Sequence, residues 1–119
     1  MKIGEFSAKY NIAPSKVRYY IHYGLLVPSV RNGQYQFNED CLRDMDYIME
    51  LQQMQFPLNE ILALITMRRK FTVLQGKDWQ NLIHILEKQK KYLSEQIDKT
   101  YDQENLLNRL IEELTPIDQ

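Results

Sequence analysis

The last third of the chain carries apolar residues in a heptad spacing. From Trp79 to Leu114 the seam positions alternate steps of four and three residues over five heptads, which is typical of a coiled coil. Such a helix, on the order of 50 Å long at 1.5 Å per residue, cannot bury its stripe on a preceding domain of about 70 residues. It needs a partner, and the simplest partner is the same helix of a second chain. The residues assigned to this dimerisation seam are Trp79, Ile83, Leu86, Leu93, Ile97, Leu107, Ile111 and Leu114.

The middle of this seam is polar. Lys90, Thr100 and Glu104 occupy seam positions where apolar residues are usual. If two copies pair antiparallel, Lys90 of one chain can meet Glu104 of the other, and we hypothesise that this pair sets the register.

A short helix near the N-terminus begins and ends abruptly. Pro14 suits the first helical position, and Gly24 suits the left-handed residue that ends a helix. Ile12, Val17 and Ile21 can face a core. The remaining faces carry two cations and two phenols, which suit a polyanion; these residues, with one serine, are Ser15, Lys16, Arg18, Tyr19 and Tyr20.

A preceding helix, from Lys2 to Tyr10, is joined to this one by three residues. Helix, tight turn and helix is the layout that places a second helix in the major groove of DNA. We expect Ser15 and Lys16 to contact bases, and Arg18, Tyr19 and Tyr20 to hold phosphates. The alternative is an ordinary surface helix whose two tyrosines are half buried in a small core.

A hairpin is predicted after this helix pair. Residues 27–31 read as extended, Asn32-Gly33 is a strong turn signal, and residues 34–37 read as the returning strand. We expect Arg31 and Tyr35 to contact phosphates or a groove, and Asn32 and Gly33 to approach DNA through their backbone. Of the two aromatic residues, we expect Phe37 to face inward and Tyr35 to face outward.

Two further helices follow. Asn38 is a good N-cap for a helix from about Glu39 to Gln53, and another helix runs from Leu58 to about Lys70. Its last turn, Arg68-Arg69-Lys70, is either a second DNA patch or the basic turn that the dipole of its own helix favours, and we favour the second. The predicted fold is mainly α: a winged helix-turn-helix domain over residues 1–71, a linker, and a coiled-coil helix over residues 78–115.

The charge of the chain is unevenly distributed. The 119 residues carry a net charge of −1, yet residues 1–37 hold five basic residues against one acidic residue. A cationic front on an acidic body is typical of a domain that binds DNA at one end. One cysteine excludes an internal disulfide, and there is neither a membrane-spanning run nor a signal peptide, so we expect a cytoplasmic protein with no membrane partner.

Several motifs occur together in a characteristic order. They are Ile3-Gly4-Glu5-Phe6, Val17-Arg18-Tyr19-Tyr20, Gly24-Leu25-Leu26, Pro28, Asn32-Gly33, Leu42, and Met54-Gln55-Phe56-Pro57-Leu58 followed by Glu60-Ile61. Over about residues 1–70 the chain closely resembles the MerR family of transcription regulators. The resemblance implies a homodimer, paired through an antiparallel coiled coil, on a pseudo-palindromic site in double-stranded promoter DNA. It also implies that the protein distorts this DNA so that promoter elements come into register for RNA polymerase.

The chain departs from the family pattern at two places. Ala13 stands where a Ser or Thr usually caps the second helix, so a capping hydrogen bond of about 1 kcal/mol is absent. Family members often carry a basic pair after the turn glycine of the wing, but here Gln34-Tyr35 follows Gly33. We therefore expect weaker contacts from the wing.

No motif indicates catalysis or a cofactor. Cys41, His22 and His84 lack the spacing of a metal site, and there is no phosphate-binding glycine loop and no nucleophile with a matching base. We expect a protein that is not an enzyme, with no cofactor and no separate effector domain. The effector, the operator and the sign of regulation stay open. One rival is a protein-interaction adaptor with a degenerate winged domain that no longer binds DNA. Another, a monomeric architectural protein, is disfavoured by the long seam.

Overall fold

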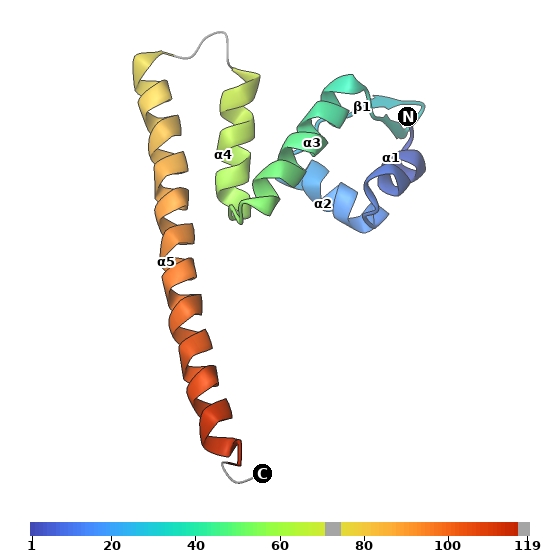
Figure 1. Ribbon diagram of the computed structural model, residues 1–119. Helices are drawn as coiled ribbons and strands as arrows, with labels where there is room; N and C mark the ends of the chain where they lie inside the picture. The colour runs from blue at the N-terminus through green and yellow to red at the C-terminus, as the bar shows by residue number, and fades with distance from the viewer. Residues whose placement is uncertain (71–74, 117–119) are drawn as a thin grey trace. The chain divides into compact units, whose positions relative to one another are not determined.

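The computed structural model describes residues 1–70 and 75–116 (Figure 1). It is mainly helical with one small antiparallel hairpin, as the sequence predicted. The elements in chain order are α1 (Ile3–Tyr10), α2 (Pro14–Tyr23), β1 (Ser29–Arg31), β2 (Gln34–Gln36), α3 (Glu39–Gln53), α4 (Leu58–Arg69) and α5 (Gly76–Leu114).

The chain divides into two compact units. The first is Met1–Leu82, and the second begins at Ile83 and contains most of α5. The predicted linker falls partly on residues 71–74, which lie outside the described residues. The domain limits at residues 71 and 78 therefore stay predictions.

Both ends of α2 follow from their residues. Ala13 gives no side-chain cap, and Pro14 occupies the first turn. Gly24 ends the helix in the left-handed region with φ of +90°, and its N–H points back to the carbonyls of Ile21 and Tyr20. A residue without Cβ is favoured at this φ, which explains why the helix stops here.

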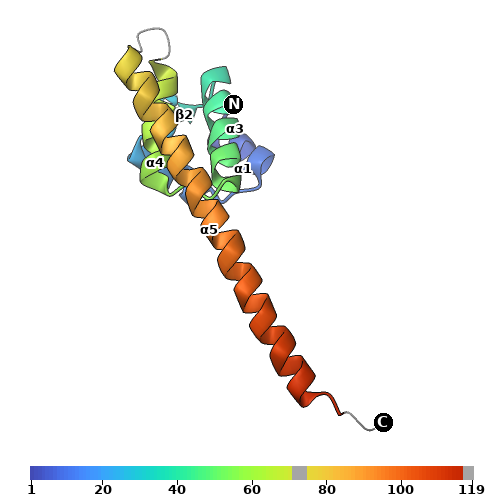
Figure 2. The same cartoon turned by 60° about the vertical axis from the view of Figure 1, so that its left-hand side comes forward.

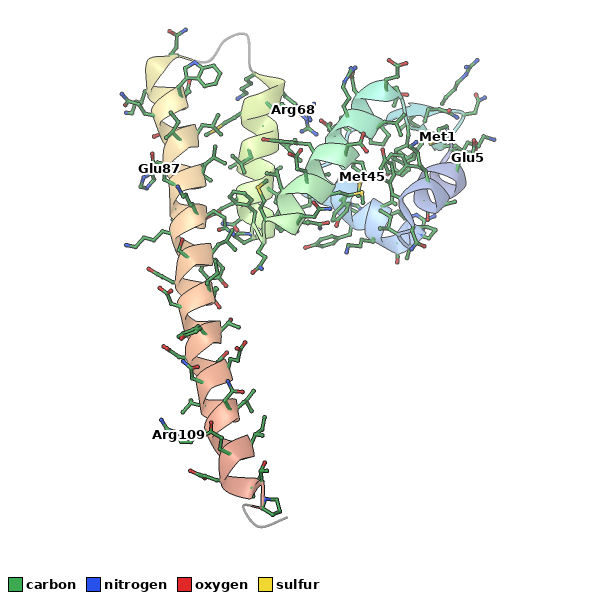
Figure 3. The ribbon with its side chains drawn as sticks, in the orientation of Figure 1. Met1, Glu5, Met45, Arg68, Glu87 and Arg109 are labelled. Atoms are coloured by element: carbon green, nitrogen blue, oxygen red, sulfur yellow. The ribbon has the colours of Figure 1, made fainter. Side chains whose placement is uncertain are left out.

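The core of the first unit lies between α1, α2, α3 and the strand end. Phe6 and Phe37 stack with ring centroids 4.3 Å apart, and Met45 projects from α3 into the same core (Figure 3). As expected, Phe37 faces inward with 3% of its surface exposed. Cys41 is also buried, and burial is the largest cause of its raised thiol pKa. It is therefore a small core residue kept as the neutral thiol.

The hairpin forms as its turn residues predict. Val30 pairs with Tyr35 and Arg31 with Gln34, and the turn residues Asn32 and Gly33 both have positive φ, at 52° and 74°. This is the two-residue turn that Asn-Gly favours. The N–H of Phe37 donates to the carbonyl of Met1 at 2.7 Å, which ties the hairpin to the start of the chain.

Helices α3 and α4 pack on one another and hold α2 in place. The Asn38 side chain accepts a hydrogen bond from the Cys41 N–H, so the predicted cap of α3 is confirmed. The basic turn of α4 differs from both readings given above. Arg69 donates to the carbonyls of Gly24 and Leu25, and Arg68 lies over the Tyr47 ring at 4.7 Å. These two side chains serve neighbouring elements and not the carbonyls of their own helix, because α4 ends beside α2 and α3.

Helix α5 is one unbroken helix of 39 residues (Figure 2). It begins at Gly76, two residues before the predicted start, and the Asp78 carboxylate accepts a hydrogen bond from the Gln75 N–H. The seam residues are largely exposed: Trp79, Ile83, Leu86, Ile97, Leu107, Ile111 and Leu114, with Leu93 half-buried. Among the described helices, none is both long enough and apolar enough to cross a membrane.

Candidate nucleic-acid interface

One face of α2 presents polar and basic side chains to solvent. Ser15, Lys16, Arg18 and Tyr19 are all exposed, while Val17 between them is buried. The Tyr19 ring stacks against Tyr23 one turn further on, with centroids 6.1 Å apart. This stacking limits the freedom of an exposed phenol, so less conformational entropy is lost when it binds a ligand.

Tyr20 does not belong to this face, and its expected exposure is wrong. Only 2% of its surface is exposed, and its hydroxyl accepts a hydrogen bond of 2.8 Å from Nε2 of Gln52 on α3. The reason is helical geometry: Tyr20 is three residues after Val17 and shares its inward face. Lys16 lies beside the ring, with Nζ 5.8 Å from its centroid. A buried ring cannot reach a phosphate, so Tyr20 supports the position of α2 instead.

The tip of the hairpin supplies a second set of exposed groups. Arg31, Asn32 and Gly33 are exposed, and Tyr35 is half-buried with its ring tilted against Phe37 at 6.3 Å. Tyr35 therefore faces neither fully outward, as expected, nor fully inward. Its position leaves one edge of the ring available to a ligand.

A groove brings α2 and the hairpin together. Its lining comes from the start of α1, from the middle of α2 and from the hairpin turn: Lys2, Ile3, Gly4, Glu5, Arg18, Gly33, Gln34 and Tyr35. Figure 3 labels Glu5 at this end of the molecule, beside Met1. Three of the predicted contact residues, Arg18, Gly33 and Tyr35, thus share one site. The remaining exposed candidates, Ser15, Lys16, Tyr19, Arg31 and Asn32, do not line the groove.

Two groove residues were missed from the sequence. Lys2 precedes α1, and Gln34 follows the turn glycine. The available signals were the basic residue just before a helix and the polar residue at the wing tip. Neither indicates a site alone, because Lys2 and Gln34 approach Arg18 only once the hairpin is tied to Met1.

The cations of this surface are unpaired. None of Lys2, Lys16, Arg18 and Arg31 forms an ion pair with any described residue. The nearest acidic group, Glu5, accepts only a long 3.5 Å hydrogen bond from the backbone N–H of Lys2. Guanidinium and ammonium groups left free beside backbone N–H groups favour phosphate oxygens as ligands.

Comparison with known proteins places the chain in a family. Residues 1–67 match the family model described as the MerR HTH family regulatory protein. Two solved structures share the fold. The first, from a cryo-EM structure of an EcmrR–DNA complex in EcmrR-RPo, is 24% identical with a TM-score of 0.73. The second, a crystal structure of a putative MerR family transcriptional regulator from Listeria monocytogenes, is 22% identical with a TM-score of 0.70.

The two solved structures differ in length. The matched region covers 95% of this chain but 39% of the EcmrR chain, whereas it covers 94% of this chain and 83% of the Listeria chain. No curated protein matches the sequence. Because the family model spans more than half of the residues and includes both α2 and the hairpin, the chain belongs to the MerR family of helix-turn-helix regulatory proteins.

Proposed function

We propose that this protein is a sequence-specific DNA-binding transcription regulator that acts as a homodimer on a pseudo-palindromic promoter site. The observation that carries the proposal is the groove in which Arg18 of α2 meets the hairpin residues Gly33 and Tyr35, with Lys2 beside them. A recognition helix and a wing that share one cationic groove can hold one stretch of DNA backbone from two directions.

Each exposed group has a role in this proposal. Lys16 and Ser15, at the start of α2, read base edges in the major groove, because recognition helices contact bases with their N-terminal residues. Arg18, Tyr19, Arg31 and Tyr35 hold phosphates, as does Lys2, while Asn32 and Gly33 approach the backbone through main-chain groups. Tyr20 is removed from the contact set. The solved EcmrR structure is of a DNA complex, which supports duplex DNA as the ligand.

The exposed seam of α5 supports the homodimer. Seven of its apolar side chains have no cover within the described chain, and a second α5 offers the same apolar stripe: Trp79, Ile83, Leu86, Ile97, Leu107, Ile111 and Leu114. A twofold dimer presents two copies of α2 to two half-sites. By deforming the DNA between them, the dimer would change how the promoter is presented to RNA polymerase.

The test is a titration of the full chain against the DNA upstream of its own gene, at several salt concentrations and with unrelated duplex as competitor. We expect binding that survives the competitor and weakens steeply with salt, because phosphate contacts release counterions. Arg18→Ala should weaken binding and lower the salt slope by about 0.9. Arg109→Ala on α5 is the matched control, since it removes one exposed arginine outside the interface and should change little.

Two further measurements complete the test. Light scattering should give the mass of a dimer, and a bent or untwisted operator should change mobility when the site is moved along a fragment. If no duplex binds at low salt, the proposal fails and the protein-interaction adaptor becomes the better explanation.

A further inference from the structure

The C-terminal end of α2 is held by a side chain from α4. Arg69 donates from Nη1 to the carbonyl of Gly24 at 3.1 Å and from Nη2 to the carbonyl of Leu25 at 2.8 Å. The same Nη2 pairs with a carboxylate oxygen of Asp44 on α3 at 3.0 Å. One guanidinium therefore connects three elements that are far apart in sequence.

This contact answers a need that α2 cannot meet alone. The last carbonyls of a helix have no partners within the helix, and that end carries partial negative charge. His22 is the only basic residue in the last turn of α2, and it is exposed. Arg69 supplies both hydrogen-bond donors and a positive charge from outside the helix. The Leu62 side chain lies over the same turn, 3.8 Å from where a Cβ on Gly24 would be.

Asp44 in turn aims the guanidinium. Its side chain is 16% exposed and that of Arg69 is 32% exposed, so the pair is partly shielded from water. Because a guanidinium is planar and its donors have a fixed geometry, two carbonyls and one carboxylate determine its orientation closely. Arg68, the preceding residue, makes no comparable contact with α2: it donates to the carbonyl of Arg43 and lies over Tyr47.

We infer that Arg69 is a positioning residue for DNA recognition, which sets the orientation of α2 on α3 and α4 without itself touching DNA. The inference rests on the proposed function, since it concerns how the recognition helix is presented to the operator. It goes beyond that function in assigning part of the affinity and specificity to a residue outside the DNA-contacting surface and outside the matched family region, residues 1–67.

The experiment compares Arg69→Gln, Arg69→Lys and Arg68→Gln in the full chain. Amide hydrogen exchange without DNA reports the end of α2 directly. We expect faster exchange at Gly24, Leu25 and Leu26 in Arg69→Gln, and exchange close to wild type in Arg68→Gln. Arg69→Lys should fall between them, because an ammonium keeps the charge but loses the forked geometry.

DNA titrations of the same proteins, well below their unfolding temperatures, give the functional readout. Arg69→Gln should bind the operator about tenfold more weakly, as expected for losing a charged hydrogen-bond pair, and should discriminate less between operator and competitor. The salt slope should stay that of wild type. A slope lower by about 0.9 with normal exchange at Gly24 to Leu26 would show a direct phosphate contact and overturn the inference. Unchanged affinity in a folded Arg69→Gln protein would also overturn it.

Failures of the two proposals can be told apart. If the wild-type protein binds no DNA, the proposed function fails, and normal exchange at the end of α2 in Arg69→Gln would then refute the positioning role as well. If Arg69→Gln does not fold, Asp44→Asn takes its place. It keeps both bonds from Arg69 to α2 but removes the carboxylate that aims them. We then expect an intermediate loss of affinity with an unchanged salt slope, and wild-type affinity would refute the role.

Discussion

The hydroxyl of Tyr20 on α2 accepts a hydrogen bond from the side-chain amide of Gln52 on α3, at 2.8 Å. The two residues are 32 positions apart, and their contact ties the recognition helix to its support. We expect Tyr20→Phe to lower the free energy of unfolding by about 1 kcal/mol, the usual net value of one hydrogen bond. DNA affinity of the folded protein should not change, because the buried ring remains. Urea unfolding together with DNA titration checks this. Lost affinity with unchanged stability would make Tyr20 a DNA contact after all.

Lys16 and Arg18 should differ in what they contribute to binding. Lys16, near the start of α2, is assigned to base edges, so Lys16→Ala should change the preference among operators by about 1–3 kcal/mol at one or two base pairs. Arg18→Ala should instead weaken all sequences alike. The measurement is affinity for a panel of duplexes with single base-pair changes. Equal losses across the panel for Lys16→Ala would reassign this residue to phosphate.

Two glycines should respond oppositely to alanine. Gly24 has φ of +90°, so Gly24→Ala should destabilise the protein by about 1–2 kcal/mol through backbone strain. The added Cβ itself would meet Leu62 at an ordinary 3.8 Å. Gly4 lies in the first turn of α1 with nothing within 4 Å of a Cβ, so Gly4→Ala should stabilise by about 0.5–1 kcal/mol. Thermal unfolding of both variants decides, and a stabilising Gly24→Ala would contradict the assigned helix end.

Tyr10 gives the stability a dependence on alkaline pH. Burial, followed by the hydrogen bond and charge of Asp46, raises the Tyr10 pKa from 10 to about 12. Because the folded state holds the phenolic proton more tightly, this stabilisation is complete below pH 10 and is lost as the pH rises to 12. In Tyr10→Phe the titration is absent. The difference in unfolding free energy between wild type and Tyr10→Phe should therefore shrink across this window. A constant difference, measured by urea unfolding at each pH, would refute the role of Tyr10.

The seam of α5 predicts a specific antiparallel register. If Ile97 lies at the twofold axis, each seam position meets a partner of matching chemistry: Trp79 with Leu114, Ile83 with Ile111, Leu86 with Leu107, Leu93 with Thr100, and Lys90 with Glu104. In this register Lys90→Glu or Glu104→Lys alone places like charges together twice per dimer and should weaken it. The double variant restores both pairs.

Mixing the two single variants tests the direction of pairing. In an antiparallel dimer, Lys90→Glu and Glu104→Lys chains complement one another at both contacts, so the mixture should form heterodimers in preference to either homodimer. A parallel dimer would place residue 90 against residue 90, and neither double variant nor mixture would recover the loss by this route. Analytical ultracentrifugation gives the association constants. Asn105→Glu, an exposed position off the seam, controls for added charge and should change little.

The sequence predicted best those features that depend on neighbouring residues. The turn at Asn32-Gly33, the stop of α2 at Gly24 and the cap of α3 at Asn38 each follow from one or two residues and their allowed backbone angles. The placements of Tyr20 and Arg69 were not predicted. Both depend on partners more than 30 positions away, Gln52 for Tyr20 and Gly24 with Leu25 for Arg69. A helical period shows that a face exists, but not which distant side chain covers it.

The candidate site shows the same division. The exposed cations of α2 could be assigned from the residues of that helix. That Arg18 shares a groove with Gly33 and Tyr35, while Lys16 and Arg31 stay outside it, follows only from the fold. Lys2 joins this groove because the carbonyl of the residue before it is bonded to the hairpin.

The bond from the Phe37 N–H to the Met1 carbonyl has a practical consequence for anyone who makes this protein. Residues fused ahead of Met1, such as a purification tag, would emerge next to Lys2 and the groove that we assign to DNA. A histidine-rich or acidic extension there would compete with phosphate for the same cations. Binding experiments are therefore best done with a cleavable tag at the other end of the chain.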